Sequence, residues 1–505
     1  MNPNKNQSFW AFLTQPPKLN KWKAIRRESM KSEISKSLDL DQEILRFSRE
    51  KADIWTLRDA VRGTQIFGAI GSGKTSGSGA AISRGFLSAG MGGLVLCVKS
   101  DEGEEWEKLI KTANREKDLI RIRAGSKIGF NFLDWENTRA MSQGGGLALN
   151  LTNFFLEMLA VIDQSSSSGG DSAFWERTVR ELLTNTLVIA SHAARPLTID
   201  LILKVIQCAP KSSTNRSDIK GFDAPENTAF SELCARARKN CPDTHQAELE
   251  QSVSYFYDYF APLADKTRSI IVTSFVSMID PILRDPLKSL FCCETSVTPE
   301  VCFEGKIIVV DMPVHTFQLV GKIANLIWKT SFKRACQQRV NPKSPVFLWI
   351  DESQYLIDKG DATFQTTARS TLCCSVFLTQ NMSNMLAEIK DRSRVESLMG
   401  SLHTKIFHQN DNYETNEWAS KMVSRLPVTI ESKTQNQKRN WADSNHTSIN
   451  KATQWEDDLP VRMFLNLKSG GPENRHVVEG IVFFSGKKFS SGKPWMIANF
   501  HQFKD

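Results

Sequence analysis

Short apolar runs and longer amphipathic stretches alternate over the first part of this chain. Apolar runs with β-branched residues occur at Gln65–Gly68, Gly93–Val98 and Leu119–Ile122, and stretches with helical periodicity separate them. Continuous apolar runs of this length are typical of parallel strands that are buried on both faces. The pattern therefore predicts an α/β fold built on a parallel sheet.

The period of the pattern changes between about 148 and 290. Long amphipathic runs at Leu147–Ile162, Phe174–Ala193 and Ala247–Phe260 predict helices. Strand character returns from Lys306 onward. We therefore expect an all-α domain inserted into an α/β domain. The predicted organisation is a polar, basic N-terminal leader (1–55), a first part of the α/β domain (56–147), the inserted all-α domain (148–290) and a second part of the α/β domain (291–505).

The second part of the chain has the same alternation as the first. Its polar stretch 427–458 lacks periodicity and predicts a long loop or an exposed hairpin. The leader is expected to be helix-prone and solvated, with contact to an anionic membrane or a partner as the alternative. A later helix is expected at Gln318–Gln338. Later strands are expected at Lys306–Met312, Val346–Asp351, Ser375–Thr379, Thr404–His408, Val477–Phe484 and Trp495–Phe500.

A glycine-rich segment has the pattern G-x-x-x-x-G-K-[ST] of a phosphate-binding loop. It lies between an expected strand at Thr64–Phe67 and an expected helix at Ser76–Leu87. Its residues are Gly68, Ala69, Ile70, Gly71, Ser72, Gly73, Lys74 and Thr75, followed by Ser76. In such a loop the backbone N–H groups surround the phosphates of a nucleotide, and the helix N-terminus adds positive potential. Lys74 is then expected to reach the β- and γ-phosphates, and the Thr75 hydroxyl to bind Mg²⁺.

The apolar run Val346–Ile350 ends in two carboxylates, Asp351 and Glu352. Ligands bind at the carboxyl ends of the strands in open α/β sheets. Asp351 is predicted to hold the Mg²⁺ shell, and Glu352 to activate water for attack on the γ-phosphate. The alternative is an ordinary strand end with solvated acids.

A second expected strand, Ser375–Thr379, ends at Gln380, which is predicted to contact the γ-phosphate or the attacking water. Arg369 precedes this strand. Because arginine often stabilises charge in phosphoryl transfer from a neighbouring subunit, Arg369 is predicted to reach into a neighbour's site if the protein forms a ring. The alternative for Arg369 is a surface helix residue.

Composition and charge limit the partners and binding sites that this protein is expected to have. The net charge of +8 is compatible with a polyanionic partner. The ten cysteines contain no C-x-x-C and indicate reduced thiols in a cytosolic protein, and the histidines show no zinc-like spacing. No run approaches the roughly 20 apolar residues of a membrane span. Candidates for DNA phosphate contacts, with solvated loop charges as the alternative, are Arg236, Arg238, Lys239, Lys433, Lys438 and Arg439, and Trp441 is a candidate for stacking on a base.

Taken together, these segments resemble the type IV secretion coupling proteins of the VirD/TraG/TraD class, within the FtsK/HerA group of RecA-like ring ATPases. The resemblance covers roughly residues 60 to 505. It rests on the phosphate loop, the helix start at Phe174, LWIDE and the Arg369–Gln380 spacing, together with the segments from Lys266, Ile307 and Ser401. It implies a RecA-like ATPase domain that uses ATP and Mg²⁺.

The same resemblance implies partners and a location. A hexameric ring would thread DNA through its channel, and the all-α domain would receive a relaxase or another protein substrate. Coupling proteins usually begin with a pair of membrane helices, which we do not find here, so a cytoplasmic protein held at the inner membrane face by partners is expected. The family's Asp-x-Lys-x-Glu motif has Cys97 in place of the leading acid, in the run Cys97–Glu102.

The sequence thus predicts an ATP-driven DNA or nucleoprotein motor for conjugative or type IV secretion transfer. A soluble FtsK/HerA-like translocase that works with a nuclease or defence complex has the same ATPase residues and remains the alternative. A non-hydrolysing scaffold is disfavoured by Glu352 and Gln380. A small-molecule kinase is disfavoured by the length of the chain.

Overall fold

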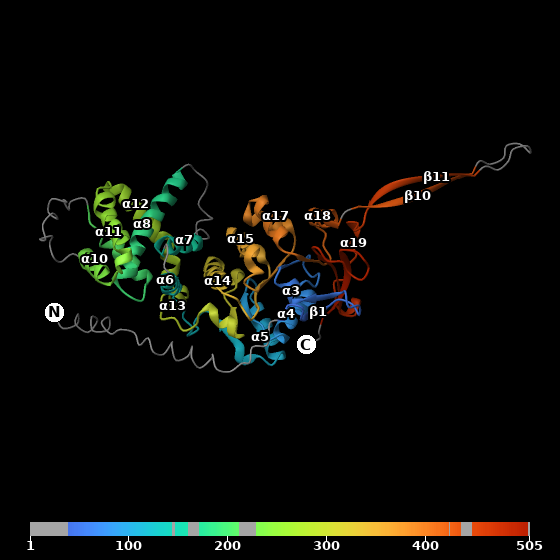
Figure 1. The fold of residues 1–505 in the computed structure, drawn as a ribbon, viewed down its shortest axis with the longest axis horizontal. Coiled ribbons are helices and arrows are strands. Elements are labelled where there is room, and N and C mark those ends of the chain that lie inside the picture. Colours follow the sequence, from blue (N-terminus) through green and yellow to red (C-terminus); the bar gives the residue numbers. More distant parts are fainter. Residues whose placement is uncertain are drawn as a thin grey trace, which may run out of the picture. The chain divides into compact units, whose positions relative to one another are not determined.

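The computed structural model describes residues 39–143, 147–159, 171–211, 229–423, 425–435 and 447–502 (Figure 1). Most of the predicted leader lies outside these ranges, and so do Lys438, Arg439 and Trp441. The side chain of Lys433 also lies outside the described part.

A nine-stranded sheet in the order β13-β12-β9-β3-β8-β7-β4-β6-β5 forms the centre of the fold. From β9 to β5 all neighbouring strands are parallel, whereas β12 runs antiparallel to β9 and β13 antiparallel to β12. The predicted α/β class is confirmed. The strands are β3 (Thr64–Phe67), β4 (Gly92–Leu96), β5 (Leu119–Ile122), β6 (Ile307–Val310), β7 (Val346–Ile350), β8 (Cys373–Thr379), β9 (Thr404–Phe407), β12 (Val477–Phe484) and β13 (Trp495–His501).

Helices cover both faces of this sheet, because alternate side chains of its buried strands point to opposite sides. On one face, the Phe347 ring of β7 stacks on Phe86 of α4 and on Trp106 of α5, with ring centroids 5.5 and 5.7 Å apart. On the other face, Leu348 and Ile350 belong to the same apolar core as residues of α14. The helices are α4 (Ala80–Ser88), α5 (Glu102–Thr112), α14 (Val314–Gln337), α15 (Lys359–Ala368), α16 (Met382–Ile389), α17 (Arg392–Ser401), α18 (Tyr413–Val423) and the short α3 (Leu57–Ala60) and α19 (Arg462–Leu465).

Between β5 and β6, every regular element in the described residues is a helix. Its longest helix, α8, contacts α7, α9, α10, α11 and α12, which form a bundle around it (Figure 1). The first helix, α6, begins at Phe132, ahead of the predicted boundary at 148. The helices are α6 (Phe132–Gln143), α7 (Leu147–Leu159), α8 (Asp171–Ala193), α9 (Ile199–Gln207), α10 (Ala229–Asn240), α11 (Gln246–Tyr255), α12 (Asp265–Ile279) and α13 (Leu287–Phe291).

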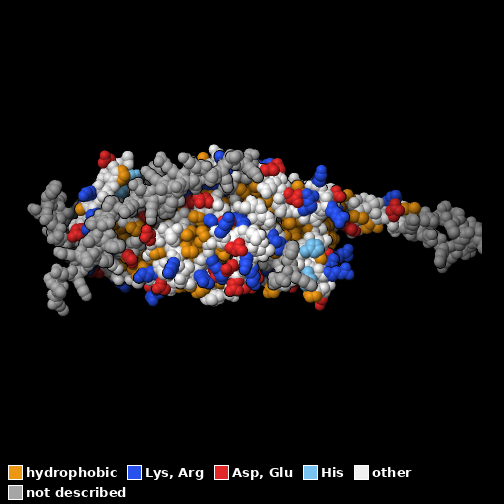
Figure 2. All heavy atoms as spheres, turned by 90° about the horizontal axis from the view of Figure 1, so that it is seen from below, with side chains coloured by type: hydrophobic (Ala, Val, Ile, Leu, Met, Phe, Trp, Pro, Cys, Tyr) orange, Lys and Arg blue, Asp and Glu red, His pale blue; other side chains and the backbone are white. Residues whose placement is uncertain are grey.

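The stretch predicted as a loop or hairpin is a hairpin. Strands β10 (Arg425–Gln435) and β11 (Thr447–Asp457) pair along their whole length, and neither pairs with any other strand in the described part of the chain. Hydrophobic side chains stay uncovered along it (Figure 2). These exposed residues are Leu426, Val428, Ile430, Ile449 and Trp455.

The end of the predicted leader differs from our expectation. Instead of a helix, β1 (Glu43–Arg46) and β2 (Ile54–Thr56) form a small antiparallel sheet. The turn between them holds Phe47, whose ring contacts those of Phe484, Phe489 and Phe500. This packing partly shields an aromatic ring that a solvated helix would leave in water.

Candidate nucleotide-binding site

The predicted phosphate loop connects β3 to α4. After Phe67 the chain turns through Gly71 and Gly73, whose φ angles of 75° and 82° are in the left-handed region that favours glycine. A π-type turn at Thr75–Gly79 then leads into α4, so the predicted strand, loop and helix are all present. A Cβ atom on Gly73 would lie 2.5 Å from Val478 Cγ2, so this close approach to β12 also requires glycine.

Contacts from distant segments hold the loop in place. Ala69 N donates to the carbonyl of Gln409 just after β9, at 2.9 Å. Ser76 Oγ accepts a 2.6 Å hydrogen bond from Gln502, which directly follows β13. The side chain of Ile70 is 82% exposed, whereas Ser72 is buried and its hydroxyl has no hydrogen-bond partner among the described residues. The tip of the loop is therefore open, and its interior holds an unused polar group.

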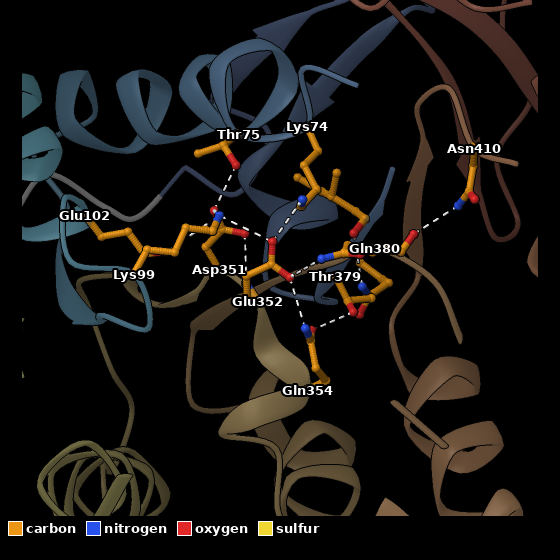
Figure 3. Close-up of polar contacts among 12 residues, drawn as sticks. Lys74, Thr75, Lys99, Glu102, Asp351, Glu352, Gln354, Thr379, Gln380 and Asn410 are labelled. Carbon is orange, nitrogen blue, oxygen red and sulfur yellow. Dashed lines mark hydrogen bonds and ion pairs between the residues drawn. The ribbon is translucent and has the colours of Figure 1, made fainter. Parts of the chain in front are cut away.

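Asp351 and Glu352, which follow β7, face the end of the phosphate loop (Figure 3). Thr75 Oγ1 donates to Asp351 Oδ2 at 2.8 Å, and Lys74 Nζ lies 3.0 Å from Glu352 Oε1. Both acids are buried, and Glu352 has a φ of 46°, which is uncommon for a residue with a side chain. Strained backbone is concentrated at functional sites. The structure thus brings together the four residues predicted to bind phosphate, bind Mg²⁺ and activate water.

Gln380 also joins this cluster. Its amide Nε2 donates to Glu352 Oε2 at 3.4 Å, and Gln354 donates to the same oxygen at 3.0 Å. Gln354 in turn accepts a 2.7 Å hydrogen bond from the Thr379 hydroxyl, and Asn410 donates to the Gln380 carbonyl at 2.9 Å. The strand ends of β7, β8 and β9 therefore hold Glu352 in a fixed orientation.

Lys99 belongs to the site but was not predicted as a site residue. It follows β4, and its Nζ lies 2.8 Å from Asp351 Oδ2 and 3.3 Å from Glu352 Oε1. The sequence showed it only as the lysine of the incomplete family motif. Its place at the carboxyl end of an apolar strand is the signal that could have identified it.

Charge neutralisation dominates the electrostatics of the site. Burial alone would raise the pKa of Glu352, but the charge of Lys74, the hydrogen bond from Gln354 and the charge of Lys99 outweigh it and lower the pKa to about 2. Glu352 is therefore fully ionised near neutral pH. The neighbouring Glu102 differs, because burial and the charge of Asp351 raise its pKa well above its usual range.

A buried histidine, His408, contacts the turn that leads from the phosphate loop into α4. His408 Nε2 lies 2.7 Å from Ser78 Oγ, and its Nδ1 lies 2.8 Å from the carbonyl oxygen of Glu479. A carbonyl can only accept, so Nδ1 carries the proton and Nε2 accepts from the serine hydroxyl. Burial lowers the pKa of His408 to about 4, so the ring is neutral.

Arg369 does not join the site. It is exposed at the C-terminal end of α15 and precedes β8, so it lies at the amino edge of the parallel strands. Its charge contributes to the lowered pKa of His403, which precedes β9, after the larger effects of burial, Arg62 and Lys405. The phosphate loop lies at the opposite edge, about 20 Å away along β8 at 3.3 Å per residue. Arg369 cannot reach the phosphate loop of its own chain in this structure.

The described DNA candidates lie in the helical region. Arg238 makes a two-fold ion pair with Glu250, with distances of 2.6 and 2.8 Å, and Arg236 lies 4.0 Å from Glu232. Lys239 is exposed in the last turn of α10. The acid partners favour the alternative of solvated surface charge for the two arginines.

The residues fit a nucleotide bound with Mg²⁺. The space beside Gly71 is open, and the unpaired Ser72 hydroxyl and the N–H groups of the loop are donors for phosphate oxygens. Thr75 Oγ1 and Asp351 Oδ2 are adjacent oxygens of the kind that Mg²⁺ prefers.

Among the described residues, the helices lack the combination of length and hydrophobicity that a membrane span needs.

This fold and site define a P-loop NTPase with an additional all-helical region. Residues 345–465 match the family model described as the TraM recognition site of TraD and TraG. No curated protein matches the chain by sequence.

The solved structures that resemble the chain include the bacterial conjugative coupling protein TrwBΔN70 in complex with sulphate, at 13% identity and a TM-score of 0.56 over 94% of this chain and 97% of that one. TrwB in complex with the ATP analogue ADPNP has 15% identity and a TM-score of 0.55, over 94% of this chain and 96% of that one. TrwB in complex with ADP and Mg²⁺ has 13% identity and a TM-score of 0.54, over 95% of this chain and 92% of that one. The chain therefore has the fold of the conjugative coupling proteins, and the resemblance predicted from the sequence is confirmed.

Proposed function

We propose that this chain binds ATP with Mg²⁺ and hydrolyses it to move DNA, or DNA with attached protein, in conjugative or type IV secretion transfer. The observation that carries the proposal is the convergence of Lys74, Thr75, Asp351 and Glu352 on one end of the sheet. The TrwB structures with ADPNP and with ADP and Mg²⁺ support the choice of nucleotide and metal.

Each residue of the cluster has a task in this reaction. Lys74 would bind β- and γ-phosphate oxygens, and Thr75 and Asp351 would hold Mg²⁺, which would supply positive charge to the phosphate oxygens. Glu352 accepts a proton from the attacking water, while Gln380 holds that water or a γ-phosphate oxygen in line.

The contacts of Glu352 indicate how the site avoids premature activity. A carboxylate whose pKa is about 2 is a weak base, and Lys74 and Lys99 both neutralise it. When Lys74 binds phosphate, Glu352 loses its nearer ammonium partner. Its basicity then rises where it is needed, because the removal of an adjacent cation raises a carboxyl pKa.

The proposed substrate and partners are those that the resemblance to coupling proteins suggests. We propose non-specific contact with the DNA backbone, a relaxase or secretion-channel proteins as partners, and assembly into a hexameric ring. The remaining phosphate-binding candidates are Lys239, Lys433, Lys438 and Arg439, with Trp441 for stacking. A cytoplasmic location at the inner membrane face, through partners, fits this role.

The alternative is an FtsK/HerA-like translocase that works with a nuclease or defence complex. It would use the same ATPase residues. The family match over residues 345–465 favours the coupling-protein function, because this segment includes β7, β8 and the hairpin and is described by its role in partner recognition.

The direct test is ATP hydrolysis by the purified full-length chain, with and without DNA. We expect Mg²⁺-dependent turnover that rises when DNA is added. Lys74→Ala should lose nucleotide binding, because the phosphates lose their main cation. Glu352→Gln should bind ATP but hydrolyse it at least about 10²-fold more slowly, the usual loss when a general base is removed.

The control is Glu473→Gln, a change of the same kind at a residue with no role in the proposed site. It should turn over ATP like the wild type. Equal turnover in the wild type and Glu352→Gln would refute the role of Glu352, and turnover unaffected by DNA would count against a DNA motor.

A further inference from the structure

Lys99 lies between three carboxyl groups of the nucleotide-binding site. Its Nζ is 2.8 Å from Asp351 Oδ2, 3.3 Å from Glu352 Oε1 and 3.9 Å from Glu102 Oε1 (Figure 3). The lysine side chain is 31% exposed, whereas the three carboxyl groups are buried. One partly exposed ammonium group thus lies near the two acids that the proposed reaction uses and near a third that it does not use.

Asp351 is the place where Lys99 and a metal ion would compete. Its Oδ2 atom accepts the hydrogen bond from Thr75 Oγ1 and pairs with Lys99. Thr75 and Asp351 are also the residues that fit Mg²⁺. Because a divalent ion and an ammonium group repel each other strongly at one buried oxygen, both cannot hold it with full strength. Binding of Mg²⁺ therefore requires Lys99 to give up at least part of this contact.

Glu102, the first residue of α5, offers Lys99 another partner. Its Oε2 atom is fixed by a 2.7 Å hydrogen bond from Val98 N. Its Oε1 atom is buried, faces Lys99, and accepts no hydrogen bond from any residue in the described ranges. An unsatisfied buried acceptor is unfavourable, and the four-carbon stem of lysine needs only a small rotation to reach it.

We propose that Lys99 exchanges partners during the nucleotide cycle: it pairs with Asp351 and Glu352 without Mg²⁺ and with Glu102 when Mg²⁺ is bound. The inference rests on the proposed function. In the first state Lys99 neutralises Asp351 in place of the metal. In the second state it leaves Glu352 free to act on water, and it ties α5 to the loaded site. Lys99 is a positioning residue, since it acts through these carboxylates.

The exchange predicts how strongly Mg²⁺ and ADP promote each other's binding. Calorimetry gives the ADP affinity of the full chain in EDTA and in saturating Mg²⁺, and the ratio of the two measures this coupling. Lys99→Met keeps the length of the side chain but removes the competing charge. It should raise the ratio about tenfold, the lower end of the effect of a hydrogen bond to a charged group. Lys99→Arg keeps the charge and should stay near the wild-type ratio.

Glu102→Gln tests the second half of the exchange. It keeps an oxygen that can accept from Val98 N but removes the second carboxyl oxygen, which receives Lys99, so the ratio should fall. In the Lys99→Met background the same change should have no effect, because no ammonium group is left to move. A merely structural role of either residue would alter ADP affinity equally with and without Mg²⁺ and leave the ratio unchanged.

Three results would overturn the inference. In the first, the ratio of ADP affinities with and without Mg²⁺ is no higher in Lys99→Met than in the wild type. In the second, this ratio is no lower in Glu102→Gln than in the wild type. In the third, Glu102→Gln changes the ratio equally in the wild-type and Lys99→Met backgrounds. If the wild type binds no ADP under any condition, the proposed function fails and takes this inference with it. If the wild type binds ADP, Lys74→Ala does not, and the ratios stay constant, only the exchange is wrong.

Discussion

Buried ionisable residues in this protein are held by partners from several segments of the chain. Asp351 and Glu352 receive hydrogen bonds or ion pairs from the phosphate loop, the end of β4 and the end of β8. His408 instead avoids charge, and its two ring nitrogens are both used by Ser78 and Glu479. Burying a charge without such partners costs several kcal/mol, so the partners fix the protonation states.

The neutral His408 predicts a pH dependence of stability. Its pKa is about 4 in the folded protein and near 6.5 when the chain is unfolded. Between these values the unfolded state binds more protons, so the free energy of unfolding should decrease as the pH falls from about 6.5 to about 4. The loss is of the order of 3 kcal/mol, from about 1.4 kcal/mol per pH unit. Urea unfolding across this range measures it.

His408→Gln is the matched variant, since an amide can make both hydrogen bonds but cannot take up a proton. The stability difference between wild type and variant should narrow as the pH falls through this window. A constant difference would show that His408 does not titrate on unfolding.

At the scale of elements, the phosphate loop depends on its contact with β12. Gly73 and Gly77 both lie against Val478, whose side chain occupies the space that a Cβ atom on either glycine would need. Gly71 has a similar positive φ, but a Cβ atom there would meet no other atom within 4 Å. The two loop glycines therefore have different requirements: Gly71 needs backbone freedom, and Gly73 needs backbone freedom and space.

This difference predicts unequal costs for two equivalent substitutions. Gly71→Ala should lower the free energy of unfolding by about 1 kcal/mol, the cost of a side chain in the left-handed region. Gly73→Ala should cost about 1–3 kcal/mol more, because Val478 must move in a packed region. Urea unfolding of both variants measures the two costs.

Val478→Ala tests whether the lost stability of Gly73→Ala can be recovered. It opens space next to Gly73, so it should recover part of the stability lost in Gly73→Ala and should not help Gly71→Ala. Equal costs for the two glycine variants, or no rescue, would show that β12 does not constrain the loop.

At the scale of the whole molecule, the position of Arg369 limits the ways in which it could take part in hydrolysis. The arginine lies at the edge of the sheet opposite the phosphate loop of its own chain, and it is exposed. A role in hydrolysis is therefore possible only in trans. We propose this role on the basis of the predicted ring.

Arg369→Ala should bind ATP normally and lose about 10³-fold in DNA-stimulated hydrolysis, as when a charge-stabilising arginine is removed. Mixing it with Lys74→Ala should restore part of the activity, because an intact phosphate loop of the first can meet an intact arginine of the second. Steady-state ATPase assays of the mixture measure this. If mixtures that co-sediment stay as inactive as each variant alone, Arg369 is an ordinary surface residue.

The sequence by itself determined the elements whose signal is local. β5 and β12 begin and end at the predicted residues, because their β-branched and aromatic residues give a local strand signal. The phosphate loop was equally clear, since its glycines, lysine and threonine act within one turn of chain. Asp351, Glu352 and Gln380 could be predicted because each ends an apolar strand, and ligands bind at those ends.

Only the tertiary structure decided which of these ends meet. The strand order places β4 next to β7, and this brings Lys99 to Asp351 and Glu352. The parallel direction of β8 puts Arg369 at the edge opposite the phosphate loop, and ring contacts of Phe47 with distant phenylalanines accompany the strands at the end of the leader. Such contacts join residues hundreds of positions apart. They depend on strand order and packing, which a local pattern of hydrophobic and polar residues does not specify.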